Sequence, residues 1–219
     1  MSSSPGARPF RLGALASGGG TNLQAIMDRC ASGELPAQVA VVVSNNSGSG
    51  ALERAHKAGI PSCHLSGATH RDPDALDRVI DDTLRSHGVD LVLLSGYMKK
   101  LGPVTLESYR NRVLNIHPAL LPSFGGKGMY GLRVHQAVLD SGVRVTGVTV
   151  HLADRAYDEG PIVVQDTVRV RQDDTPETLA ARVLEIEHSL YSEAVRLFAE
   201  GRITVDGRRV HIREEPRVS

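Results

Sequence analysis

Tryptophan is absent from the 219 residues of this chain, which has only three phenylalanines and two cysteines. The apolar runs are also far shorter than the roughly 20 residues that cross a bilayer, so we expect no membrane span. There is no Cys-x-x-Cys pair and no histidine at ligand spacing beside a carboxylate, so we expect no metal. Cys30 and Cys63 lie in or beside apolar segments, which favours buried small side chains over reactive thiols or a disulfide.

An excess of charge of one sign is lacking as well. Lysine and arginine together number 25, as do aspartate and glutamate, so the formal net charge is zero. Without a basic excess to neutralise a phosphate backbone, we expect no nucleic acid among the partners. The N-terminus lacks the apolar stretch of a secretory signal, and together with the few cysteines this predicts a cytoplasmic location.

One domain is expected over residues 10–213, because a chain of this length with 41% hydrophobic residues supplies one sizeable core. Residues 1–9 are small, proline-containing and aperiodic, which predicts a disordered leader. Residues 214–219 are interpreted as a tail.

Apolar runs alternate with segments of helical spacing in the first half of the chain. Residues 11–16 form an apolar run, and after a glycine turn apolar residues recur at positions 23, 26, 27 and 30. The alternation continues with strands at 39–43 and 89–94 and helices near 49–58 and 73–87. Continuous apolar strands are typical of sheets covered on both faces, so we predict an α/β fold with a Rossmann-like, doubly wound, mostly parallel sheet.

The pattern changes after residue 110. Strand-like stretches at 113–116, 143–152 and 161–170 enclose only one helix, near 131–140, which predicts antiparallel strands in the C-terminal half. A last helix is expected at 175–199, with Thr175 as its cap and Pro176 at its first position. Asp206-Gly207 between two short apolar runs predicts a two-residue hairpin turn.

A glycine loop, Ser-Gly-Gly-Gly-Thr-Asn at residues 17–22, lies between the first strand and the first helix. Exposed backbone N–H groups and the helix dipole make such a loop an anion site, and Thr21 with Gln24 predicts a capping box. The loop lacks the third glycine of a dinucleotide fingerprint and the Gly-Lys-Ser/Thr ending of a P-loop. We therefore expect a small phosphomonoester as its ligand, a plain tight turn being the alternative.

Three further places carry polar residues in positions suited to chemistry. Asn115 and His117 end an apolar strand two residues apart, so both side chains face one point. The alternative is a hydrogen-bonded strand terminus. Asp158 lies with Glu159 in the loop at 157–161, where most acids are solvated turn formers. Glu187 lies within the apolar stripe of the last helix, so it needs a donor or cation, either a ligand amine or a neighbouring arginine.

The remaining polar features are interpreted more plainly. The histidines at 135, 151 and 188 are taken as structural or surface residues. The glycine-rich stretch at 125–131 has high backbone freedom, which suits either a lid over a site or an ordinary flexible loop.

Taken together, four segments resemble the phosphoribosylglycinamide formyltransferases, which are folate-dependent. They are residues 16–24, residues 95–101, the Asn-Ile-His-Pro-Ala-Leu-Leu-Pro run at 115–122, and residues 150–151 with 158–161. The resemblance covers roughly residues 10–213. It implies transfer of a formyl group from 10-formyltetrahydrofolate to the amine of 5-phosphoribosylglycinamide in purine synthesis, without a metal, by a monomer or homodimer.

The resemblance also implies roles for individual residues. Asn115 and His117 would stabilise the charge that develops on the formyl oxygen, His117 would protonate the leaving folate nitrogen, and Asp158 would raise the pKa of His117 and help to remove the amine proton. The acceptor's phosphate would lie on Gly20, Thr21 and Asn22, with Glu187 on its amine side. The residues implied to contact folate are Arg71, Met98, Lys99, Lys100, Leu101, Asn115, Ala156 and Tyr157.

Three other functions fit parts of the pattern. A 10-formyltetrahydrofolate deformylase uses the same Asn, His and Asp with water as the acceptor, but that family carries an added N-terminal domain. A formyltransferase for initiator tRNA is less compatible with the even balance of charge. A non-catalytic module for sugar phosphates would keep the glycine loop without needing Asn115, His117 and Asp158 together.

Overall fold

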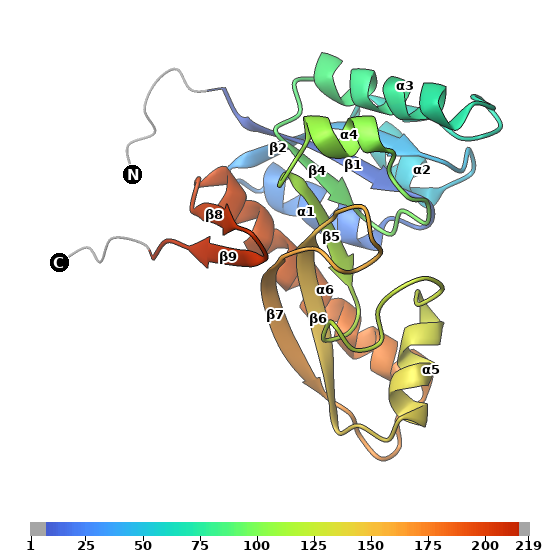
Figure 1. The fold of residues 1–219 in the computed structure, drawn as a ribbon, viewed down its shortest axis with the longest axis vertical. Coiled ribbons are helices and arrows are strands. Elements are labelled where there is room, and N and C mark those ends of the chain that lie inside the picture. The colour runs from blue at the N-terminus through green and yellow to red at the C-terminus, as the bar shows by residue number, and fades with distance from the viewer. Residues whose placement is uncertain (1–7, 215–219) are drawn as a thin grey trace.

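Residues 8–214 are described in the computed structural model of the chain (Figure 1). Most of the predicted leader and tail, residues 1–9 and 214–219, therefore lies outside the described residues. Arg8 is the informative exception, because its Nη1 and Nη2 donate to the two carboxylate oxygens of Asp90 at 2.8 and 2.7 Å. A defined ion pair thus forms before residue 10, the predicted start of the domain.

The central sheet has seven strands in the order β3-β2-β1-β4-β5-β6-β7. The first five in this order are parallel, and the interiors of β1, β2 and β4 are buried, as expected for strands covered on both faces. The prediction of a doubly wound, mostly parallel sheet is confirmed. These strands are β1 (Phe10–Ala16), β2 (Ala37–Ser44), β3 (Ser62–His64), β4 (Leu91–Leu94) and β5 (Val113–His117).

The C-terminal half of the sheet is antiparallel, as predicted. Strand β6 (Val145–Leu152) pairs antiparallel with β5, and β7 (Ile162–Arg169) pairs antiparallel with β6. In this register Asn115 lies opposite His151 and His117 lies opposite Thr149. The register therefore brings a second histidine beside the end of β5, although 36 residues separate His151 from Asn115 along the chain.

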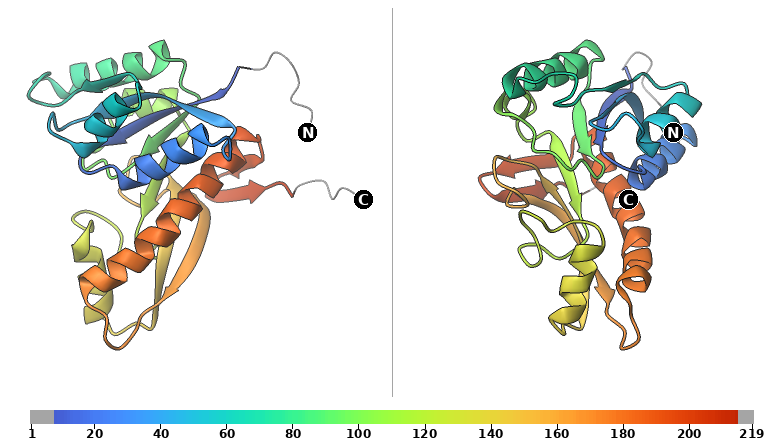
Figure 2. Two further views of the ribbon diagram at one scale, coloured as in Figure 1. Left: turned by 180° about the vertical axis from the view of Figure 1, so that it is seen from behind. Right: turned by 90° about the vertical axis from the view of Figure 1, so that its right-hand side faces the viewer.

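Helices cover both faces of the sheet (Figure 2). Each face has its own apolar core. Helices α1, α2, α5 and α6 pack on one core and α3 and α4 on the other. The long helix α6 runs beside β6 and β7, as the orange helix in Figure 2 shows. The helices are α1 (Thr21–Ala31), α2 (Gly50–Lys57), α3 (Pro73–Ser86), α4 (Pro103–Ser108), α5 (Leu132–Asp140) and α6 (Pro176–Ala199).

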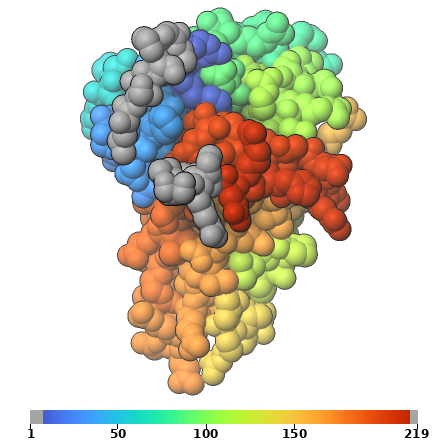
Figure 3. Space-filling model, turned by 90° about the vertical axis from the view of Figure 1, so that its left-hand side faces the viewer, coloured from blue at the N-terminus to red at the C-terminus, as the bar shows by residue number. Residues whose placement is uncertain are grey.

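The start of α6 and the last hairpin are both present as predicted from the sequence, except that the turn of the hairpin is shifted by one residue. The Thr175 side chain caps α6 by accepting from the backbone of Thr178, with Pro176 at the first helical position, as predicted. Strands β8 (Ile203–Asp206) and β9 (Arg209–Ile212) pair Asp206 with Arg209, so the turn is Gly207-Arg208 and not Asp206-Gly207. The positive φ of Gly207, 56°, suits the first central residue of a primed turn. Figure 3 shows this hairpin in red at the molecular surface.

Two short elements have no counterpart in the sequence pattern, namely β3 and α4. Their sequences, Ser-Cys-His and Pro-Val-Thr-Leu-Glu-Ser, are too short for either period to show. Cys30 and Cys63 are free and half-buried, and burial raises the pKa of both thiols, that of Cys30 to about 11. Within residues 8–214, no helix is long and apolar enough to cross a membrane.

Candidate active site

A cavity of about 690 Å³ opens where the parallel strands end. Its wall is built from the start of α1, the segments that follow β4, β5 and β6, the loop before α5, and one face of α6. The order β3-β2-β1-β4 reverses the direction of winding between β1 and β4, and ligands of α/β sheets bind at such a switch point. The topology alone therefore places a ligand site at this cavity.

The loops after β1 and β4 are tied together at the switch point. The backbone N–H of Ser17 donates to the carbonyl oxygen of Gly96 at 3.1 Å, and the Ser17 hydroxyl accepts from the Met98 N–H at 2.7 Å. The same hydroxyl donates to the side chain of Asn45, at the end of β2. Ser17 thus fixes the glycine loop relative to residues 96–98.

Asp158 is the point on which the polar side chains of the cavity converge. Asn115 Nδ2 lies 3.3 Å from Asp158 Oδ1, and His117 Nδ1 lies 3.6 Å from Asp158 Oδ2. The Asp158 side chain is only 12% exposed, and that of His117 is 5% exposed. The structure therefore brings the three residues that the sequence singled out to one place. The alternative that Asp158 is a solvated turn residue is wrong, because its side chain is largely buried. Its neighbour Glu159 is exposed.

His151 is the fourth member of this cluster. The sequence pattern had indicated only a structural or surface role for this histidine. Its Nδ1 donates to the carbonyl oxygen of Leu152 at 3.0 Å, so Nε2 is free to accept from Asn115 Nδ2 at 3.0 Å. His151 Nε2 also lies 3.5 Å from Asp158 Oδ1. This side chain orients the Asn115 amide, and the antiparallel pairing of β5 with β6 was the signal that could have located it.

Local backbone conformation aims Asp158 and the carbonyl group that partners His117. Asp158 has a φ of 58° and Phe124 a φ of 56°, both within the left-handed region that non-glycine residues seldom adopt. His117 Nε2 donates to the Phe124 carbonyl oxygen at 2.8 Å, and the Gly126 N–H donates to Asp158 Oδ2 at 2.9 Å. A Cβ at Gly160 would lie 1.7 Å from the Leu152 carbonyl oxygen, so only glycine lets the loop return this closely to β6.

Burial sets the direction of the pKa shift of His117. Burial disfavours the charged ring and lowers its pKa below the ordinary value, although the charge of Asp158 and the bond to Phe124 act in the opposite direction. Asp158 acts on the pKa of His117 in the expected upward direction, but burial outweighs its charge. Burial would raise the pKa of Asp158, but the contacts with His151, Gly126 and His117 outweigh it and lower that pKa. Asp158 is thus an anion at neutral pH beside a mainly neutral His117.

The glycine loop presents backbone donors, but the predicted capping box is wrong. Gly20 is the N-terminal cap of α1 with φ 72°, Thr21 is the exposed first residue, and no side chain caps the helix. Among the described residues, the N–H groups of residues 18–22 donate no hydrogen bond, so they are free to bind an anion.

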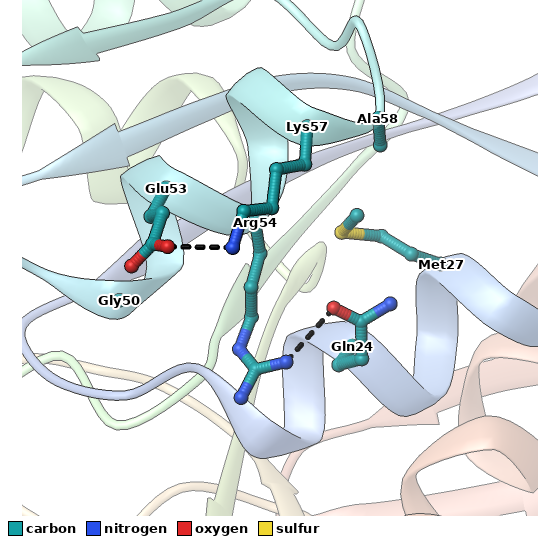
Figure 4. Close-up of a pocket in the computed structure, with 7 residues that line it drawn as sticks. All are labelled: Gln24, Met27, Gly50, Glu53, Arg54, Lys57 and Ala58. Atoms are coloured by element: carbon teal, nitrogen blue, oxygen red, sulfur yellow. Dashed lines mark hydrogen bonds and ion pairs between the residues drawn. The ribbon is translucent and has the colours of Figure 1, made fainter.

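Gln24 instead belongs to a second, smaller hollow of about 490 Å³ between α1 and α2 (Figure 4). The Arg54 guanidinium donates to Gln24 Oε1 at 3.0 Å and to the carbonyl oxygen of Gly19 at 2.8 Å. Arg54 therefore holds the glycine loop from behind, on the side of α2.

Asn22 and Glu187 meet on the cavity wall. Asn22 Nδ2 donates to Glu187 Oε2 at 2.6 Å, so the donor that this carboxylate needs is an amide and not an arginine. Burial raises the pKa of Glu187, and the hydrogen bond from Asn22 opposes this shift. The buried Asn22 Oδ1 has no hydrogen-bond partner among the described residues. Both residues are part of the cavity wall.

Most of the residues that the resemblance assigned to folate line the cavity. Met98, Lys99, Lys100, Leu101, Ala156 and Tyr157 are all part of its wall. Lys100 Nζ lies 5.7 Å from the centre of the Tyr157 ring, so the segment after β4 contacts the segment after β6. Arg71, also assigned to folate, is exposed and does not line the cavity. Gly20 and Thr21, which were assigned to the acceptor phosphate, do not line it either. The glycine-rich stretch at 125–131 also forms part of the wall, through residues 126–131.

Comparison with known protein families agrees with this geometry. The formyl transferase family model matches residues 10–195, so this chain belongs to the formyl transferase family. A phosphoribosylglycinamide formyltransferase from Arabidopsis thaliana chloroplasts is 45% identical over 197 residues, covering 90% of this chain and 68% of that protein.

Two solved structures are similar to this chain over most of its length. A glycinamide ribonucleotide transformylase from Symbiobacterium toebii is 46% identical, with a TM-score of 0.88 over 94% of this chain and 95% of that one. A formyltetrahydrofolate deformylase from Pseudomonas syringae is 27% identical, with a TM-score of 0.85 over 95% of this chain and 67% of that one.

Proposed function

We propose that this chain transfers the formyl group of 10-formyltetrahydrofolate to the amine of 5-phosphoribosylglycinamide, which yields formylglycinamide ribonucleotide and tetrahydrofolate in purine biosynthesis. The observation that supports this most is the convergence of Asn115, His117 and His151 on the anionic Asp158 in one cavity. The Arabidopsis thaliana protein is named a phosphoribosylglycinamide formyltransferase and the Symbiobacterium toebii structure a glycinamide ribonucleotide transformylase, and the two similarities cover 90% and 94% of this chain.

The acceptor fits the half of the cavity next to α1 and α6. Its phosphate binds the free N–H groups of residues 18–22, where the dipole of α1 adds a favourable field. Glu187 and Asn22 offer oxygens to the polar N–H and O–H groups of the ribotide. The amine that is to be formylated then points from this wall toward Asp158.

The formyl donor fits the opposite half. The backbone of residues 96–101 and the segment at 156–158 supply hydrogen-bonding groups for the pterin. Lys99 and Lys100 also line the cavity, and their charges suit the carboxylates of the glutamate tail of folate.

The proposed reaction begins when the amine nitrogen attacks the formyl carbon. Negative charge develops on the formyl oxygen, and the Asn115 N–H that now contacts Asp158 at 3.3 Å is the longer and more replaceable of its two bonds. Asn115 therefore donates to the formyl oxygen while His151 holds the amide in place.

The proton of the attacking amine then has a defined route. Asp158 accepts it, directly or through water, and passes it to Nδ1 of His117, 3.6 Å away. His117 starts neutral because of its lowered pKa, with its Nε2 proton held by Phe124. The ring delivers the Nδ1 proton to the folate nitrogen as the bond from that nitrogen to the formyl carbon breaks.

Hydrolysis of the formyl donor is the second candidate, because the deformylase structure named above shares the fold at a TM-score of 0.85. The two functions differ in the acceptor and not in the cluster around Asp158. Absorbance of 10-formyl-5,8-dideazafolate with purified protein, measured with and without the ribotide, separates them. Turnover that requires the ribotide supports the transferase, turnover without it supports the hydrolase, and no turnover in either condition rejects both.

A further inference from the structure

His135 on α5 differs from the other two histidines of the cavity in its hydrogen bonding. It lines the cavity and is only 4% exposed, yet its buried Nδ1 has no hydrogen-bond partner among the described residues. By contrast, each ring nitrogen of His117 and His151 has a polar contact within the protein. A buried polar atom without a partner is destabilising, so it is seldom retained without a reason.

The surroundings of His135 place it on the acceptor side. Helix α5 packs against α6, and the α6 residues Ala180, Leu184 and Glu187 form the adjacent wall of the cavity. The residues assigned to folate, 96–101 and 156–158, lie on other segments. His135 therefore belongs to the wall that faces the ribotide.

His135 is also held neutral. Burial lowers its pKa, and the nearby ring of His117 lowers it further. A neutral imidazole has one donor and one acceptor nitrogen, which matches the N–H and C=O groups of an amide.

We propose that His135 is a substrate-binding residue whose imidazole hydrogen-bonds the glycinamide group of the acceptor beside His117. The inference rests on the proposed function, which supplies the identity of the acceptor. It explains why a buried ring nitrogen that has no hydrogen-bond partner within residues 8–214 is present in the cavity wall.

The test compares three variants of His135 with a matched control. His135→Leu removes both nitrogens at similar volume, whereas His135→Asn and His135→Gln keep an amide near the former Nδ1 or Nε2. The control is His188→Leu, because His188 also has a buried ring nitrogen without a partner but does not line the cavity. For each protein, KM for the ribotide, KM for the folate and the melting temperature without ligand are measured.

We expect His135→Leu to raise the ribotide KM about tenfold, with the folate KM nearly unchanged and the melting temperature equal to or above that of the wild type. At least one of His135→Asn and His135→Gln should recover most of the loss, and His188→Leu should leave both KM values unchanged. An unchanged ribotide KM in His135→Leu, an equal rise in both KM values, or failure of both amide variants overturns the inference. Absence of ribotide-dependent turnover in the wild type would instead reject the proposed function itself.

Discussion

The two ends of the cavity are built in different ways. At the end of β1, the glycine loop offers backbone N–H groups that belong to one continuous segment, residues 18–22, of which Asn22 lines the cavity. At the ends of β5 and β6, the site consists of side chains, and Asn115 and Asp158 are 43 residues apart in the chain. The first end depends on local conformation, whereas the second depends on strand register and on one tightly returning loop.

This difference predicts where a single substitution is most damaging. The proposed phosphate contacts of the glycine loop are made by backbone N–H groups, so they tolerate side-chain changes that leave the loop intact. A site of converging side chains loses its function when one charge or one loop moves.

The largest loss is expected from Asp158→Asn, which keeps the shape of the side chain and removes its charge. In the proposed reaction the Asp158 carboxylate, which faces both imidazoles, accepts the amine proton, so kcat should fall by about 10²–10⁴-fold. Steady-state kinetics with saturating substrates measures this. Glu159→Gln, one residue away and exposed, is the matched control and should keep near wild-type rates. Comparable rates in both variants would contradict the assigned role.

A smaller but clear loss is expected from Gly160→Ala. The new Cβ would lie 1.7 Å from the Leu152 carbonyl oxygen, so the loop that carries Asp158 must move. A displacement of about 1 Å at a reacting group costs roughly 10²-fold in kcat/KM. Gly67→Ala is the control, since a Cβ there meets no atom within 4 Å. If Gly160→Ala were as active as Gly67→Ala, the close return of this loop would not be what positions Asp158.

The backbone end should respond more weakly and only toward one substrate. Asn22→Ala removes the donor to Glu187, and we expect the ribotide KM to rise about tenfold while the folate KM stays nearly constant. Thr21→Ala should have a smaller effect, because the exposed Thr21 side chain does not cap the helix and its backbone N–H remains. Determination of both KM values for each variant checks this. A larger change in the folate KM would exclude the acceptor from this end.

The smallest effect concerns stability and pH. The folded-state pKa of Glu187 is raised above its ordinary value of 4.5, so the folded protein binds more protons than the unfolded chain as pH rises past that value. The raised pKa of the buried Glu187 therefore makes the free energy of unfolding smaller at neutral pH than at acidic pH. Glu187→Gln should melt at a higher temperature than the wild type at pH 7, and the difference should vanish below about pH 4.5.

Thermal melts across this pH range test the Glu187 prediction. The control is Glu185→Gln, on an exposed position of the same helix, which should show no such pH dependence. A Glu187→Gln variant that is less stable than the wild type at pH 7 would refute the stated cause of the shift.

Sequence patterns located the backbone end and the strand ends because their signals are local. The apolar run before residue 17, the three glycines and the Asn-x-His spacing each lie within a few residues, and all define features that the structure contains. Glu187 could also be predicted from the sequence as a candidate site residue, because a carboxylate in an apolar helical stripe requires a partner. The identity of that partner, Asn22, depends on how α1 packs against α6 and is not encoded in either helix alone.

The parts that escaped prediction are those fixed by tertiary structure. His151 is brought to Asn115 by the antiparallel register of β6, and the net pKa shift of His117 follows from burial that no local pattern reveals. The predicted Thr21 cap failed because Gly20 adopts the left-handed conformation in its place. The single-domain organisation, cytoplasmic location and oligomeric state stay predictions.

The fate of the formyl carbon tests the central claim most directly. Purified protein is incubated with 10-formyltetrahydrofolate labelled with ¹³C in the formyl group and with an excess of 5-phosphoribosylglycinamide, and the products are analysed by NMR. We predict that the label appears in an N-formyl amide of the ribotide, with the Asp158→Asn variant forming little of it. Label recovered as free formate, at a rate that the ribotide does not alter, would contradict the account.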